Sequence, residues 1–398
     1  MPRHALKPSP TLARMLRARR EELGWSVREV TARSAEVGDR IPPVTLLKIE
    51  AGTQEPGVRR FYALLRLYRL PLEVVPDLLE LESLAAEAPK ETDPDTLLAR
   101  GKEHWAKGEI GPGLACLFAL RQVAAAGRRG DRVVQRALLS FAIAAGSIGR
   151  VRLANHLVSE LLVAPPDPSL RLNVLVQAAV TWRDLGSPDA SLAFLMQAES
   201  CEGASAPGVR AWILHARANA LLDAGCIGEA SVAMTAAREA YEAAGDPVNA
   251  AHALGVRIRI LLAEGRVREA RELAEQTLAE AEQAGMKLVA LNRRIDLGRC
   301  LVALGQTKDA IARLTEGLAH ALLARSRTAE FRAHFWLWKA WTAAGDREQA
   351  RLEYALAVNR LQSMDEVTWE SRELRSSMTT GGEHEKPYRP RRRRPRPG

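Results

Sequence analysis

Apolar residues recur at helical spacing along most of the chain, and a longer period is superimposed on that spacing. The strongest copies lie 40 residues apart: LLDAGCIGEA (221–230), LLAEGRVREA (261–270), LVALGQTKDA (301–310) and WTAAGDREQA (341–350). Each copy shows the end of one amphipathic helix, a glycine, and a second helix that carries an alanine. Weaker copies surround Gly108, Gly149 and Gly186. The pattern predicts helical hairpins that bury their apolar faces by stacking on neighbours.

The predicted array runs from about 93 to 363 and holds about seven hairpins. Glycine releases the chain from one helix into a tight turn, and alanine lets the second helix pack closely on the first. The x-L-G-x-x-x-x-A core resembles the tetratricopeptide repeat (TPR), although the unit here is longer than that family's usual one. The resemblance implies an all-α fold, a right-handed α-solenoid whose hairpins line a concave groove.

Two columns of polar residues run through the aligned repeats. Six residues before each glycine stand Asn219, Arg259, Arg299 and Lys339, and seven residues earlier stand Trp212, His252, Asn292 and Arg332. A separation of seven residues places both columns on one face of a helix. With the TPR resemblance, this predicts a groove of hydrogen-bond donors for the backbone, carboxylate or phosphate of an extended ligand. The predicted ligand-groove residues are Asn219, His252, Arg259, Asn292, Arg299, Arg332 and Lys339. A solvated polar face is the alternative.

The aromatic residues of the last repeat, FRAHFWLWKAWTAAG (331–345), form a separate feature of the array. They surround their helix almost completely. This arrangement favours a packed cap or a dimer surface over a ligand cage.

Shorter helices are predicted between residues 10 and 80. A first helix ends at Gly24, and Ser26 with Glu29 forms a capping box for a second. A short helix follows between Pro42 and Gly52, with Leu46, Leu47 and Ile49 expected to face inward. Segments 61–70 and 72–79 complete a compact five-helix domain.

This domain resembles the Cro/C1-type (XRE) helix-turn-helix family over roughly residues 11–75, on the segments REELGWSVREV and LLKIEAGTQEP. The resemblance implies a DNA-binding domain with 43–50 as its recognition helix and a structural pair, Arg20 with Glu50. Three departures stand out. Val27 replaces a common glutamine, the turn before the third helix is about five residues longer, and Pro42 and Pro43 present no donors.

Within that resemblance, Thr45 and Lys48 are the residues expected to contact bases, with Val44 against a thymine methyl group. Arg28 and Arg40 are expected to contact phosphates, which supply affinity without sequence discrimination. One short helix reads few bases, so a homodimer on double-stranded DNA is expected.

The net charge of +9 is concentrated at the two ends of the chain. Residues 1–70 hold 14 Lys and Arg against 7 Asp and Glu, residues 372–398 hold 9 against 3, and the remainder holds 34 against 38. Basic ends on a slightly acidic body fit contact with a polyanion. The expected domains are a basic arm (1–10), the helix-turn-helix domain (11–80), a linker (81–92), the repeats (93–363) and a C-terminal segment (364–398) with a disordered Arg/Pro-rich tail.

Residues and motifs typical of catalysis or metal binding are few. Four scattered cysteines, dispersed histidines and the absence of a phosphate-binding glycine loop or nucleophile motif predict no catalytic residue, no metal, no cofactor and no enzyme activity. No apolar run is long enough to span a membrane, and no secretory signal is visible, so a cytoplasmic protein is expected.

These features together resemble bacterial transcription regulators whose repeats receive a signal, in some cases a secreted peptide. We therefore expect DNA binding by the helix-turn-helix domain, with the solenoid mediating dimerisation and sensing a peptide or a protein partner. The alternative is an interaction scaffold in which the solenoid binds a protein and the small domain docks it or binds nucleic acid nonspecifically.

Overall fold

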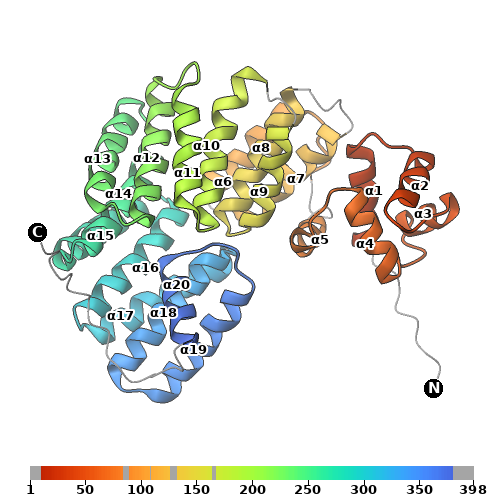
Figure 1. Ribbon diagram of the computed structural model, residues 1–398. Helices are drawn as coiled ribbons and strands as arrows, with labels where there is room; N and C mark the ends of the chain where they lie inside the picture. The colour runs from red at the N-terminus through yellow and green to blue at the C-terminus, as the bar shows by residue number, and fades with distance from the viewer. Residues whose placement is uncertain (1–9, 84–88, 108, 126–131, 164–166, 380–398) are drawn as a thin grey trace, which may run out of the picture. The chain divides into compact units, whose positions relative to one another are not determined.

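The computed structural model describes residues 10–83, 89–107, 109–125, 132–163 and 167–379, and every regular element in these ranges is a helix (Figure 1). The expected all-α fold is therefore confirmed for this part of the chain. Residues 1–9 of the predicted basic arm, 84–88 of the predicted linker and 380–398 of the predicted tail lie outside the described residues.

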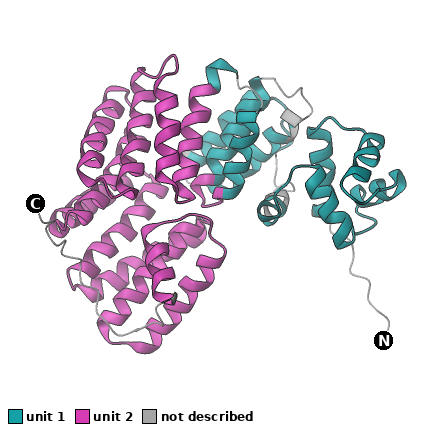
Figure 2. Cartoon of the chain, in the orientation of Figure 1, with its two compact units in different colours: residues 1–105, 109–145, 152–170 teal, residues 106–108, 146–151, 171–398 magenta. Residues whose placement is uncertain are grey.

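The chain divides into two compact units, which are described separately (Figure 2). Unit 1 comprises residues 1–105, 109–145 and 152–170, and unit 2 comprises 106–108, 146–151 and 171–398. Unit 1 contains the short N-terminal helices and most of the first two hairpins. Unit 2 contains the other hairpins and the C-terminal helix.

Unit 1 begins with short helices whose ends follow from the local sequence. They are α1 (Pro10–Glu22), α2 (Val27–Glu36), α3 (Pro43–Glu50), α4 (Val58–Leu67), the 3-10 turn η1 (Leu72–Val74) and α5 (Val75–Ser83). Gly24 lies in the turn between α1 and α2 and has a φ of +68°, which glycine adopts without strain. The predicted capping box is confirmed, because the Glu29 amide donates to Ser26 Oγ (3.2 Å) and the Ser26 amide donates to Glu29 Oε2 (2.6 Å).

A small apolar core holds these helices together. The apolar residues with at most 1% exposure are Leu16, Val30, Ile41, Leu46, Ile49, Leu64, Tyr68 and Val74. Burying such a side chain contributes about 1.5–3 kcal/mol relative to leaving it exposed. Leu46 and Ile49 therefore fix one face of α3, as expected for a helix too short to be stable alone.

The first two hairpins pair α6 (Pro94–Ala106) with α7 (Ile110–Ala125), and α8 (Arg132–Ser147) with α9 (Val151–Val163). Within unit 1, ion pairs connect them to α1. Glu22 Oε1 lies 3.0 Å from Arg121 Nη2, and Arg19 Nη1 donates to Glu160 Oε2 at 3.2 Å. Arg19 is 4% exposed, so these carboxylates compensate a buried charge.

Unit 2 continues the repetition to the end of the described chain. Its helices are α10 (Pro168–Asp184), α11 (Pro188–Glu199), α12 (Pro207–Asp223), α13 (Ile227–Ala243), α14 (Pro247–Ala263), α15 (Val267–Gln283), α16 (Lys287–Ala303), α17 (Thr307–Leu323), α18 (Arg327–Ala344), α19 (Arg347–Gln362) and α20 (Trp369–Thr379). Consecutive pairs from α6/α7 to α18/α19 make seven hairpins, which confirms the expected number. The repeats form an α-solenoid with α20 as an extra helix.

The glycine and alanine columns have the roles that the pattern predicts. The four turn glycines, Gly225, Gly265, Gly305 and Gly345, have φ between +75° and +84°. The alanines five residues later, Ala230, Ala270, Ala310 and Ala350, are at most 8% exposed. Small side chains therefore lie where the two helices of each hairpin approach most closely.

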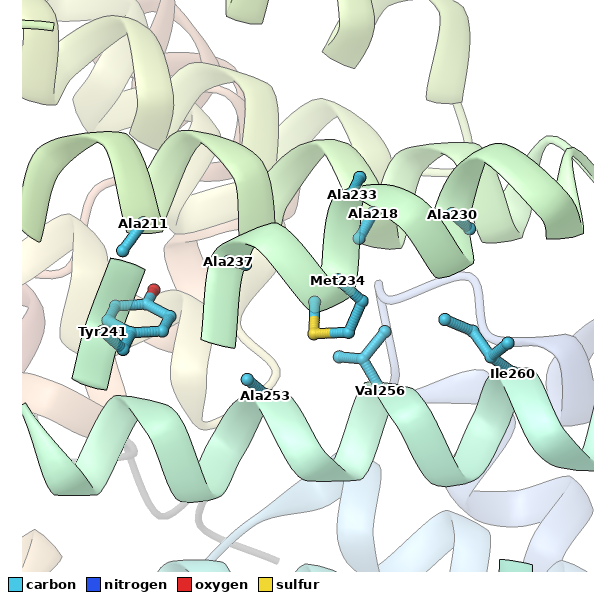
Figure 3. Close-up of a cluster of buried hydrophobic side chains, with 10 residues drawn as sticks. All are labelled: Ala211, Ala218, Ala230, Ala233, Met234, Ala237, Tyr241, Ala253, Val256 and Ile260. Carbon is cyan, nitrogen blue, oxygen red and sulfur yellow. The ribbon is translucent and has the colours of Figure 1, made fainter. Parts of the chain in front are cut away.

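The cluster formed by α12, α13 and α14 shows how neighbouring hairpins share a core (Figure 3). Ala211 and Ala218 lie on α12, Met234 and Tyr241 on α13, and Val256 on α14. A single hairpin could not bury this surface, because the third helix supplies one wall of the cluster.

The aromatic residues of α18 are part of the interior of unit 2. Phe331, Phe335 and Trp336 are fully buried, and Phe335 contacts Trp336 and Trp338 edge to face. Trp369 of α20 stacks on Trp336, with ring centroids 6.0 Å apart. Of the two predicted roles, the packed cap matches this arrangement.

Candidate functional site

The first candidate site is the outward face of α3. Val44 is 63% exposed, and Lys48, one helical turn later, is also exposed. Thr45 lies between them and is half-buried. Arg28 on α2 and Arg40 in the loop before α3 are exposed. All five predicted DNA contacts therefore lie at least partly on the surface of this domain.

The expected orientation of Leu47 was wrong. Leu46 and Ile49 are buried, but Leu47 is 53% exposed. A helix of eight residues has one buried stripe, formed here by Leu46 and Ile49. Leu47 lies one turn after exposed Val44, and both face away from that stripe. The outward face of α3 is consequently more apolar than the sequence pattern suggested.

The long loop between α2 and α3 is held by specific hydrogen bonds. The Ile41 amide donates to Ser34 Oγ (2.9 Å), and Arg59 Nη2 donates to the Gly38 carbonyl (3.4 Å). Ile41 itself is fully buried. These contacts fix the point at which α3 begins, so the additional loop residues do not release it from the domain.

The predicted structural pair between Arg20 and Glu50 is confirmed. Arg20 Nε donates to Glu50 Oε1 (2.8 Å) and Nη2 donates to Oε2 (2.9 Å), which is bidentate geometry. Arg20 Nη1 also donates to the Trp25 carbonyl (2.9 Å). The guanidinium therefore connects α1, the start of α2 and the end of α3.

The second candidate site is a cavity of about 370 Å³ in unit 2. Five of the seven predicted groove residues line it together: Asn219, His252, Arg259, Asn292 and Arg332. The repeat period therefore brings side chains from α12, α14, α16 and α18 to one cavity.

The other two predicted groove residues, Arg299 and Lys339, are placed elsewhere in unit 2. The Arg299 guanidinium lies 5.3 Å from the Trp336 ring and 5.2 Å from the Trp369 ring. Lys339 Nζ lies 4.2 Å from the Trp338 ring and 2.8 Å from Glu373 Oε1. Both cations are in contact with aromatic rings rather than with the cavity.

Ion pairs and hydrogen bonds orient the arginines of the cavity. Arg259 donates to Asn219 Oδ1 (2.9 Å) and to Asp223 Oδ1 (3.0 Å). Arg332 donates to Asp296 Oδ1 (2.9 Å) and to Glu370 Oε1 (3.2 Å). Each guanidinium is held in place while remaining part of the cavity wall.

Two histidines of the cavity are neutral. Burial lowers the pKa of His215 to about 3 and that of His252 to about 4, and nearby cationic groups act in the same direction. At neutral pH their imidazoles therefore offer one donor and one acceptor each, without charge.

The cavity is also lined by residues that were not among the predicted ones, including Arg293, Asp296 and Gly255. Arg293 and Asp296 form an ion pair of 2.9 Å in which each side chain is 4% exposed. The repeat alignment contained a usable signal, because the equivalent positions are apolar in the neighbouring repeats. A charged pair at repeat positions that are otherwise apolar indicates a role for these residues beyond packing of the helices.

The segment that follows α19 contacts the end of α10 and the start of α18 within unit 2. The Val367 amide donates to the Asp184 carbonyl at the end of α10 (2.6 Å), and Thr328 Oγ1 of α18 donates to Glu366 (2.5 Å). Burial and the nearby carboxylate of Asp184 raise the pKa of Glu366 to about 7.

The next carboxylate of this segment, Glu370, accepts from Arg332 and from Trp336 Nε1. Burial acts to raise its pKa, but Arg332 and Arg299 beside it lower the pKa to about 2. Glu366, with a raised pKa, and Glu370, with a lowered pKa, are therefore four residues apart in the same segment of unit 2.

Among the described residues, no group of His, Cys, Asp and Glu side chains has the proximity needed to hold a metal ion. Within the same residues, no helix is both long and apolar enough to cross a membrane.

Comparisons with known proteins bear mainly on the N-terminal helices. Residues 16–75 match the family model described as Helix-turn-helix. A comparison with curated proteins finds no match.

Among solved structures, the chain is similar to a Rap protein complexed with competence and sporulation factor (12% identity, TM-score 0.48, 67% of this chain and 87% of that chain). It is also similar to a signal-transduction ATPase with a tetratricopeptide repeat sensor from Pyrococcus horikoshii (14%, 0.46, 88% and 57%). A third structure is the apo competence regulator ComR from Streptococcus vestibularis (11%, 0.27, 94% and 98%). These values are too low to indicate a shared function.

The domain architecture of the chain follows from the matched segment and from the repeats. The helices within 16–75 have the capping box, the short third helix and the Arg20–Glu50 pair described above. The seven hairpins that follow have the glycine turns and buried alanines of stacked helical repeats. The chain therefore joins an XRE-type helix-turn-helix domain to an α-solenoid of TPR-like repeats.

Proposed function

We propose that the chain is a transcription regulator that binds a specific DNA site through α3 and receives a ligand or partner signal in its solenoid. The observation that carries the proposal is the exposed outward face of α3 in a segment that matches a helix-turn-helix family. Its opposite face is held by the core and by Glu50, so the helix is presented as a rigid element.

In the proposed complex, α3 enters the major groove, and Thr45 and Lys48 contact base edges. Val44 packs against a thymine methyl group, while Arg28 and Arg40 contact phosphates on either side. Each good base contact contributes about 1–3 kcal/mol of discrimination. Two copies of the chain, reading half-sites about 34 Å apart, supply the specificity that one short helix lacks.

The solenoid part of the proposal rests on the cavity lined by the polar columns of unit 2. A bound peptide, protein segment or small molecule that favours one arrangement of the repeats would shift the population of DNA-binding dimers. The size of that shift is limited by the difference in affinity of the ligand for the two arrangements.

The test is a binding selection from genomic fragments, made with the full chain at near-physiological salt. The expected result is one palindromic site. With Thr45→Ala/Lys48→Ala, discrimination between this site and random DNA should disappear. With Arg28→Ala/Arg40→Ala, affinity should fall for all sequences, and the slope of log K against log salt should decrease by about 2, one for each lost phosphate contact.

An interaction scaffold is the second candidate, and one observation favours it. Val44 and Leu47 give the outward face of α3 an apolar character that suits a protein partner. If α3 docks a protein, the selection should recover no common site. The change Leu47→Ser should then weaken the partner complex, while Thr45→Ala/Lys48→Ala should leave it intact.

A further inference from the structure

Arg293 and Asp296 stand where the neighbouring repeats carry apolar side chains. The positions equivalent to Arg293 are Ile213, Ala253 and Ala333, and those equivalent to Asp296 are Ala216, Val256 and Trp336. Both charged residues are buried, at 3% exposure of the whole residue. A buried ion pair seldom contributes more stability than the hydrophobic residues it replaces, so stability alone does not account for this pair.

The surroundings of Arg293 are arranged for its guanidinium. Gly255 of α14 lies beneath it, and a Cβ at that position would overlap the guanidinium atoms. Asp296 is shared, because Arg293 Nη1 and Arg332 Nη2 each donate to one of its oxygens at 2.9 Å. Arg293 Nε has no hydrogen-bond partner among the described residues. The guanidinium is therefore part of the cavity wall, and its Nε–H is a donor without a partner among the described residues.

One residue of the cavity wall is held from the segment that follows α19. Glu370 accepts from Arg332 at 3.2 Å, and Trp336 of α18 donates to the same carboxylate at 3.2 Å. The cavity has a volume of about 370 Å³. Cavities of roughly 300–1,000 Å³ suit small organic ligands, and this one lies at the lower end of that range.

We propose that this cavity binds a small organic anion, with its carboxylate or phosphate group on Arg293 and its body against the neutral polar groups of the wall. Asn292 and the uncharged imidazole of His252 supply hydrogen bonds to that body. The inference rests on the proposed role of the solenoid as a receptor, and it assigns that receptor a small anion rather than an extended peptide.

The test is calorimetric titration of the full chain at constant ionic strength with four probes. These are citrate as a carboxylate, glycerol 3-phosphate as a phosphate, glycerol as a neutral control, and a peptide with the sequence of residues 364–374. Saturable binding of citrate or glycerol 3-phosphate is expected, and the stronger of the two identifies the anionic group. Glycerol should not bind.

The variant that tests the assignment is Arg293→Met, which keeps the side-chain volume and leaves Asp296 paired with Arg332. Affinity for the anion should fall at least about tenfold, since hydrogen bonds to a charged group contribute that much. Arg217→Met is the matched control, because Arg217 lies on α12 in an exposed pair with Glu199 outside the cavity. The affinity of the Arg217→Met variant for the anion should be unchanged.

Three outcomes would overturn the inference: no saturable binding of either anion, equal binding by Arg293→Met, or binding of the peptide alone. If Arg293→Met melts early, Arg293→Lys serves instead, because it keeps the buried charge and loses the planar fork. DNA binding to the selected site is measured in parallel. If the chain binds its DNA site but no anion, only the anion-binding proposal is wrong. If it binds the anion but no specific DNA site, only the proposed role as a transcription regulator is wrong.

Discussion

Replacing Glu50 by alanine should loosen α3 and leave the rest of the helix-turn-helix domain folded. Glu50 holds the end of α3 to α1 through two hydrogen bonds of 2.8 and 2.9 Å to Arg20. The Glu50 side chain is 4% exposed and that of Arg20 is 13% exposed, so the pair is largely removed from water. Its loss leaves a partly buried guanidinium that keeps the hydrogen bond to the Trp25 carbonyl and lies 3.5 Å from Glu21 Oε1.

The expected cost is about 3 kcal/mol. Removing one partner of a buried ion pair costs roughly 3–5 kcal/mol, and the lower end applies because water reaches Arg20 and one hydrogen bond is kept. A cost of about 3 kcal/mol corresponds to about 150-fold faster exchange of those α3 amides that exchange by local opening.

Hydrogen exchange of the full chain, followed by mass spectrometry over peptides containing residues 43–51, measures this change. Arg17→Ala is the control, because Arg17 lies on the same helix as Arg20 and the Arg17–Glu21 pair is 2.9 Å long but exposed. Its removal should leave α3 exchange unchanged. A double variant, Glu50→Ala/Arg20→Ala, should be less destabilised than the sum of the single variants. If exchange of the α3 amides in Glu50→Ala equals that in the control, or if the two single effects add, the ion pair does not hold α3 in place.

Three further predictions concern unit 2. Gly186→Ala should speed amide exchange in the segment after α19, because Gly186 has a φ of +86° and a Cβ there would approach Val367 at 3.1 Å; unchanged exchange would contradict this. The pKa of Glu366 is raised to about 7, so the folded state holds its proton more tightly than the unfolded state does. Its stability contribution is therefore present below the ordinary pKa near 4.5 and is lost as pH rises through about 7, by at most about 3 kcal/mol. Thermal melting between pH 4.5 and 8 checks this, and Glu366→Gln should flatten the profile. Gly298→Ala should destabilise unit 2 by about 1–3 kcal/mol through overlap with Leu314, measured by urea unfolding, with a neutral result counting against the packing argument.

Much of the fold could be predicted from the sequence, because local and repeating signals determine it. The glycine period located the hairpin turns, and the alanine column located the close contacts between helices. The Ser26–Glu29 capping box located the start of α2 within one residue. Such signals are short-range, so a single sequence contains them in full.

The orientation of α3 was only partly predictable. Its two prolines and the glycine after it set its ends, but eight residues are too few for a clear amphipathic period. The inward face therefore depended on which neighbours cover it, and Leu47 was placed wrongly. A hydrophobic pattern identifies a buried stripe reliably only when it repeats over several turns.

The groove shows the same division between sequence and structure. The 40-residue columns brought five predicted side chains to one cavity, because equivalent positions in stacked repeats share a face. Arg299 and Lys339 were placed on aromatic rings instead, and those rings come from α18 and from α20, which is outside the repeat pattern.

By itself, the sequence determined the helices, their turns, the repeat number and the surface position of the candidate DNA contacts. Only the tertiary structure decided that Arg293 lies over Gly255, that Asp296 is shared with Arg332, and that the segment after α19 contacts α10 and α18. The physical reason is sequence distance. Helix periodicity and capping act within a few residues, whereas a buried charge is compensated by whichever distant residues the packing brings to it.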